Sequence, residues 1–126
     1  MNIMLWVLQA LLAMAFAAHG LFLLFPPASM IAQMNATLLP AFRIFIGVAE
    51  VVAAFGLIVP GVTRIQPWWV PCAAAGLMIV MISATIFHIV RGEFSSAATT
   101  AILLVMATTV AYMRWKVRPI LPRAVA

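Results

Sequence analysis

PAFRIFIGVAEVVAAFGLIVP, residues 40–60, is the stretch that decides the fold of this chain. It is apolar over almost its whole length and long enough for an α-helix to cross a bilayer. Glu50 lies near its centre, where a charged side chain costs about 2.5–3.5 kcal/mol on insertion-derived scales. The stretch therefore predicts a membrane-spanning helix that carries a carboxylate in need of a partner.

The composition extends this prediction to the rest of the chain. Hydrophobic residues make up 67% of the 126 residues and charged residues only 7%, whereas soluble domains carry about 25% charged residues. We therefore predict an all-α fold, an integral membrane four-helix bundle that forms a single domain over residues 1–126. The expected helices cover about residues 3–25, 40–59, 68–90 and 96–113.

Prolines mark the expected helix ends. Pro26 and Pro27 should end the first helix, and the second should stop before Pro60, because proline lacks the N–H that a helix interior needs. Residues 28–39 form a more polar connection with enough apolar residues for a short interfacial helix. The N-terminal residues contain no Lys or Arg, so we expect a retained first helix rather than a cleaved signal peptide.

The basic residues predict the orientation. With four spans, both termini and the link between the second and third helices lie on one side of the membrane. That side carries Arg64, Arg114, Lys116, Arg118 and Arg123, and the other side carries Arg43 and Arg91. Lys and Arg are in excess on cytoplasmic loops, so both termini are predicted to be cytoplasmic. The same side carries the aromatic residues Trp6, Trp68, Trp69, Tyr112 and Trp115, which are typical of a membrane interface.

Several function classes find no support in the sequence. The net charge of +5 is explained by orientation, so nucleic acid is not expected as a partner. The lone Cys72 excludes an internal disulfide and a CxxC redox pair. No HxxxH or ExxH spacing is present, so no metal site is predicted, and nucleotide-binding fingerprints are absent. Axial haem ligation by His19 and His88 is geometrically conceivable, so the cofactor is left open.

Four polar residues of the predicted spans are the candidate catalytic residues: Glu50, His88, His19 and Arg43. Glu50 lies about 15 Å below the outer end of its helix and His19 about 9 Å below the end of its own. Side chains lean toward the N-terminus of a helix, so Glu50 leans outward and both histidines lean inward. His19 is the closer axial match for Glu50, and His88 is the alternative partner.

Arg43 and Glu50 share a helix face with Gly47, at spacings of four and three residues. The absent glycine side chain leaves room for a water or a ligand between the two charges. Simpler interpretations also exist. Arg43 could extend to the outer headgroups, either histidine could be a packed or interfacial residue, and Glu93 could be a solvated loop charge.

Two stretches carry a family resemblance, FRIFIGVAEVVAAFGLIVP at residues 42–60 and AAAGLMIVMISATIFHIVRGE at residues 73–93. With Gly47-x-x-Glu50, the following Pro60, and His88 before a basic turn, the chain resembles the DoxX-like family of small bacterial membrane proteins. The resemblance implies a multi-pass four-helix bundle, which we expect in the bacterial inner membrane.

The functional implications of the resemblance are broader. Some relatives are associated with thiosulfate:quinone oxidoreductase or with oxidative-stress complexes, whereas most have no assigned activity. The first hypothesis is an oxidoreductase component that handles a quinone or another small lipophile, with Glu50 as the proton carrier. The second is a non-redox enzyme, such as an isomerase or an epoxide-opening enzyme. The third is a non-catalytic complex subunit or small transporter. The expected partners are the lipid bilayer, a lipophilic molecule, and a membrane protein or second copy of the chain.

Overall fold

A computed structural model describes residues 2–124 of the chain. This part folds into helices α1 (Asn2–Leu24), α2 (Ala28–Thr37), α3 (Pro40–Thr63), α4 (Trp69–Val90) and α5 (Phe94–Tyr112), followed by the π-helical turn η1 (Met113–Val117). It contains no strands, and four of its helices are long and apolar enough to span a membrane. The prediction of an all-α membrane helical bundle is therefore confirmed.

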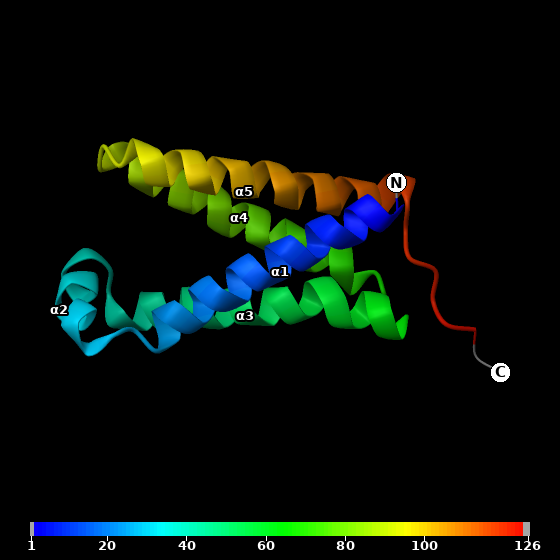
Figure 1. Cartoon of the computed structure of the whole chain (residues 1–126), viewed down its shortest axis with the longest axis horizontal. Helices are drawn as coiled ribbons and strands as arrows, with labels where there is room; N and C mark the ends of the chain where they lie inside the picture. The colour runs from blue at the N-terminus through cyan, green and yellow to red at the C-terminus, as the bar shows by residue number, and fades with distance from the viewer. Residues whose placement is uncertain (1, 125–126) are drawn as a thin grey trace.

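The four long helices form two pairs, α1 with α3 and α4 with α5, and α3 also packs against α4 (Figure 1). We call the end that carries the start of α1 and the turn η1 the basal end, and the opposite end, which carries α2, the α2 end. In this view the two pairs lie close together at the basal end and diverge toward the α2 end. The start of α1 and the turn η1 thus share one side, as predicted for the two ends of the bundle, whereas the cytoplasmic assignment of that side stays a prediction.

Apolar side chains lie both inside and outside the bundle. The core contains Leu12 and Phe16 of α1, Leu57 of α3, Leu77 of α4 and Val110 of α5. Large hydrophobic residues are also widely exposed, among them Phe45, Phe55, Ile79 and Val105 at more than 60%. Such a surface is suited to lipid chains rather than water.

The predicted end of the second helix at residue 59 is wrong, because α3 continues through Pro60 to Thr63. The proline ring lies against the carbonyl four residues earlier, at Gly56, which has no side chain to restrict adjustment of the backbone. Membrane helices tolerate such a proline where the surroundings accommodate the freed carbonyl. The helix instead ends at Thr63, and the residue that follows it, Arg64, has a left-handed φ of 59°. The link at residues 28–39 contains the short helix α2, none of whose residues is buried.

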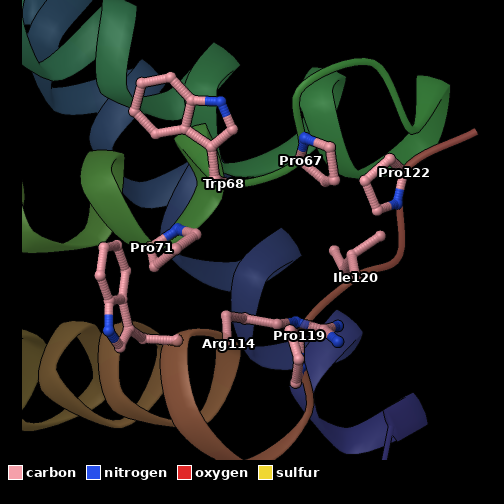
Figure 2. A pocket seen from close by; sticks show the side chains of 8 residues that line it. Pro67, Trp68, Pro71, Arg114, Pro119, Ile120 and Pro122 are labelled. Carbon is pink, nitrogen blue, oxygen red and sulfur yellow. The ribbon is translucent and has the colours of Figure 1, made fainter.

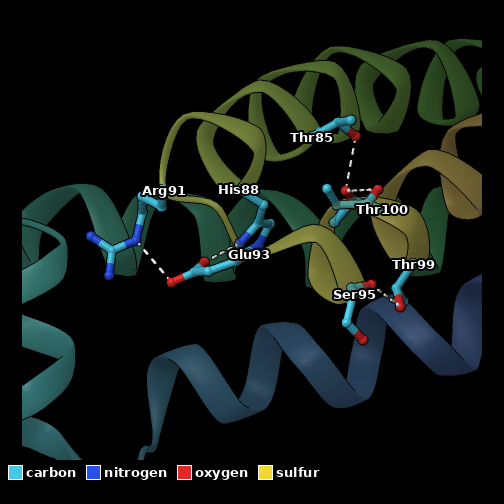
Figure 3. Close-up of polar contacts among 8 residues, drawn as sticks. Thr85, His88, Arg91, Glu93, Ser95, Thr99 and Thr100 are labelled. Carbon is cyan, nitrogen blue, oxygen red and sulfur yellow. Dashed lines mark hydrogen bonds and ion pairs between the residues drawn. The ribbon is translucent and has the colours of Figure 1, made fainter.

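Hydroxyl side chains mainly bond to their own helices. Ser83 donates to the Ile79 carbonyl and Thr108 to the Leu104 carbonyl, both four residues earlier. Thr85 of α4 and Thr100 of α5 bond to carbonyls of their own helices as well, and their hydroxyls also lie 2.8 Å apart across the two helices (Figure 3). These groups hold α4 and α5 together near the α2 end.

Candidate functional site

The site is built on a close crossing of α1 and α3 at Gly20 and Gly47. A Cβ on Gly20 would lie 2.8 Å from the Gly47 carbonyl oxygen, and a Cβ on Gly47 would lie 3.0 Å from the Gly20 carbonyl oxygen. Only glycine permits this backbone approach, as in other membrane helix pairs. Because α1 and α3 run in opposite directions, the crossing brings the part of α1 near its end beside the part of α3 near its start, toward the α2 end. Glu50 then lies on one side of it and Arg43 on the other.

His19 and Glu50 form a pair beside this crossing. Nδ1 of the His19 ring lies 2.7 Å from Oε2 of Glu50, and with an ionised carboxylate the ring nitrogen is the donor. Glu50 is buried, with 1% of its side chain exposed, whereas 57% of the His19 side chain is exposed. In a membrane, such exposure means contact with lipid chains or with molecules dissolved among them. A single imidazole therefore links the buried carboxylate to the lipid-facing surface.

Arg43 lies on the other side of the crossing but does not turn toward Glu50. Its Nη1 donates to the carbonyl oxygen of Leu23, in the last turn of α1, and its side chain is buried. The last carbonyls of a helix have no partners within the helix, so a cation there is favourable. The interpretation that Arg43 extends to the headgroups is thus wrong. The guanidinium also does not face Glu50 across a shared ligand space.

His88 belongs to a different cluster. Its Nδ1 lies 2.6 Å from Oε2 of Glu93, and Nε of Arg91 donates to Oε1 of the same carboxylate at 3.0 Å (Figure 3). The tight turn between α4 and α5, with Gly92 at a φ of 71°, brings these side chains together. His88 is therefore not the partner of Glu50, and Glu93 is more than a solvated loop charge. The hydrogen bonds from His88 and Arg91 lower the pKa of Glu93 below its usual value.

A buried polar cluster at the basal end was missed by the sequence analysis. Gln9 of α1 is fully buried and donates from Nε2 to the Leu57 carbonyl oxygen at 2.7 Å. Its Oε1 accepts from Nε of Arg114 at 2.5 Å, and Nη1 of Arg114 donates to Oδ1 of Asn2 at 2.7 Å. One signal was present, because Asn2, Trp6 and Gln9 are spaced to share one face of the first helix.

The His19–Glu50 pair is part neither of a metal-binding cluster nor of the pocket between α3 and α4 among residues 2–124. Within residues 2–124, no three His, Cys, Asp or Glu side chains come together to hold a metal ion. A pocket of about 550 Å³ lies between α3 and α4, lined by apolar residues and Cys72, but neither His19 nor Glu50 lines it. The pair at the crossing is thus separate from that pocket.

Comparison with known proteins supports the family resemblance. The family model described as the DoxX-like family matches residues 7–110, which include all four long helices almost completely. No curated protein and no solved structure matches the chain. The matched region contains the Gly20–Gly47 crossing, both histidines and both glutamates, but not Arg114. This multi-pass membrane protein belongs to the DoxX-like family.

Proposed function

We propose that the His19–Glu50 pair is a proton-exchange site for a small lipophilic molecule dissolved in the membrane, with a quinone as the first candidate. The observation that supports the proposal is the contrast in burial within the pair. The carboxylate is 1% exposed, and the imidazole bonded to it at 2.7 Å is 57% exposed. One member of the pair can thus hold a charge away from lipid while the other meets a ligand.

The chemistry of imidazole suits this role. A polar ring that faces hydrocarbon is costly unless its nitrogens are paired. Nδ1 of His19 is paired with Glu50, so Nε2 is the nitrogen left for a ligand. A protonated ring donates from both nitrogens, and a quinone carbonyl oxygen is an acceptor. The ring would transfer its Nε2 proton to that oxygen, and the negative charge of Glu50 would then favour its reprotonation.

The balance of the reaction requires a further participant. Reduction of a quinone to a quinol consumes two electrons and two protons. The pair would deliver the protons one at a time, and the electrons would come from a redox protein that associates with this chain. Some DoxX-family relatives are associated with quinone-dependent oxidoreductases, which makes a quinone the first ligand to test.

The test is binding of a short-chain ubiquinone analogue to the full chain in lipid nanodiscs. We expect His19→Gln to weaken binding by about tenfold or more, because a hydrogen bond from a charged donor contributes about 1.5–3 kcal/mol. Glu50→Gln should weaken it as well. His88→Gln is the matched control, since it makes the same change in the separate Glu93 cluster, and it should bind as the wild type does.

Infrared spectroscopy of the same samples tests the hydrogen bond from His19 to the quinone. Binding should shift the carbonyl stretch of the quinone in the wild type and in His88→Gln, but not in His19→Gln. If the wild type does not bind the analogue, or if His19→Gln binds it equally well and shows the same shift, the proposal is wrong. The pair would then serve only to hold α1 against α3.

A further inference from the structure

Arg114 is a buried cation without an acidic side chain to neutralise it. Only 3% of Arg114 is exposed. The chain has two acidic side chains, and both are engaged elsewhere, Glu50 with His19 and Glu93 with His88 and Arg91. A guanidinium cannot lose its proton to escape the cost of burial. The positive charge at this position therefore has no compensation from the side chains of the chain itself.

The neighbours of Arg114 satisfy only part of its guanidinium. Nε and Nη1 donate to neutral oxygens of Gln9, Asn2 and the Arg118 backbone, and the cation lies 5.1 Å from the centre of the Trp6 ring. Nη2 is buried and finds no hydrogen-bond partner among residues 2–124. This nitrogen has two N–H donors available for an acceptor from outside the chain.

A pocket of about 310 Å³ adjoins this guanidinium. Its walls come from the link between α3 and α4, from the start of α4, from η1 and from the segment after it, and they include Trp68, Pro71, Trp115 and Ile120. Figure 2 shows the Arg114 side chain reaching along the pocket toward Pro119, below Ile120. The guanidinium of Arg114 thus lies beside a pocket whose other walls are proline rings, indoles and an aliphatic side chain.

We propose that this pocket binds the phosphate group of an anionic membrane phospholipid, with Arg114 as its counter-charge. The pocket lies at the basal end, where Trp68 and Trp115 are half-exposed, as is typical of residues at the headgroup level. Basic pockets between membrane helices at this level recognise anionic headgroups. The exposed side chain of Arg118 adds positive charge beside it.

The apolar walls favour a lipid over a free anion. A phosphate ion from solution would pair with Arg114 but would leave the indoles and prolines with nothing apolar to contact. A phospholipid fills both requirements, since its phosphate accepts from the guanidinium while its glycerol and upper acyl carbons lie on the pocket walls. The segment over the pocket is held through Arg64, whose side chain donates to the Leu121 and Pro122 carbonyls.

The experiment uses the full chain, delipidated in a neutral detergent, and follows its thermal unfolding. Phosphatidylglycerol, phosphatidylcholine with the same acyl chains, and inorganic phosphate are titrated in parallel. We expect phosphatidylglycerol alone to raise the unfolding temperature. The Arg114→Gln variant should require a phosphatidylglycerol concentration about ten times that of the wild type, or higher, for the same rise in unfolding temperature. The reason is that it loses charge-assisted hydrogen bonds. Lys116→Gln removes an equal charge two residues away and should respond as the wild type does.

Each contrary result overturns the proposal. Equal protection by phosphatidylcholine would remove the role of charge, and equal protection by inorganic phosphate would assign the site to a soluble anion. An equal loss in Lys116→Gln would indicate diffuse attraction at the surface. If Arg114→Gln does not fold, Pro119→Trp carries the test, because it fills the pocket from an exposed position and keeps Arg114. Wild-type affinity for phosphatidylglycerol in that variant would also contradict the proposal.

Discussion

Two of the buried charges of this protein, Glu50 in the middle of α3 and Arg114 at the basal end, are handled in opposite ways. Glu50 bonds to an ionisable ring that is itself largely exposed, whereas Arg114 is surrounded by neutral oxygens and an aromatic face. A carboxylate can take up a proton when it loses its partner, but a guanidinium stays charged. The carboxylate is therefore suited to proton exchange and the guanidinium to permanent binding of an anion.

The comparison predicts the largest loss of stability for Gln9→Leu. This change removes the Oε1 acceptor of Arg114 and leaves a buried charged donor unpaired. The guanidinium cannot lower this cost by losing its proton. We expect the free energy of unfolding to fall by about 3 kcal/mol. Reversible unfolding in mixed micelles measures it. A decrease of less than about 1 kcal/mol would indicate that water or lipid readily replaces the glutamine.

A smaller loss is expected for Gly20→Ala, which tests the crossing that positions the Glu50 pair. The added Cβ would lie 2.8 Å from the Gly47 carbonyl oxygen, so the helices must separate at a cost of about 1–3 kcal/mol. Gly76→Ala is the matched control, since nothing lies within 4 Å of a Cβ added there. The same unfolding measurement should show no loss for the control. Equal losses in both variants would indicate a general response of the helices to alanine.

His19→Leu should cost less than Gln9→Leu, about 1–2 kcal/mol, because Glu50 can become neutral by binding a proton. The measurement is infrared spectroscopy of the carboxyl group together with unfolding. We expect the band of a protonated carboxyl to grow in His19→Leu and to vanish in His19→Leu combined with Glu50→Gln. If Glu50 stays ionised in His19→Leu, it does not differ from Arg114 in the way proposed, because it does not become neutral when its partner is removed.

The smallest effect is expected at the Glu93 cluster, which is partly exposed at the turn between α4 and α5. The pKa of Glu93 is lowered in the folded protein, most strongly by the hydrogen bond from His88 and next by the one from Arg91. The stabilisation is therefore complete above the unfolded pKa of about 4.3 and is lost as the pH falls through the lower folded value. Thermal unfolding between neutral and strongly acidic pH should show this loss. Glu93→Gln should remove that part of the pH dependence, and an unchanged profile would contradict the assignment.

The sequence predicted most of the fold because its signals are local. Apolar length, proline positions and the clustering of Trp residues indicated four spans with both chain ends on one side, and α3 differs from its prediction mainly beyond Pro60. Glu50 stood out because a carboxylate is costly in the middle of an apolar segment. Arg114 did not stand out, because a basic residue near a helix end has an ordinary explanation as an orientation signal.

By itself, the sequence determined that this chain is a helical membrane protein and that Glu50 needs a partner, since both follow from the transfer cost of residues along one segment. Only the tertiary structure decided which groups meet. The Gly20–Gly47 approach assigned His19 to Glu50, the tight turn assigned His88 to Glu93, and the basal packing brought Arg114 to Gln9, 105 residues apart in the chain. Periodicity places a residue on a helix face, but the rotation and separation of neighbouring helices decide what that face contacts.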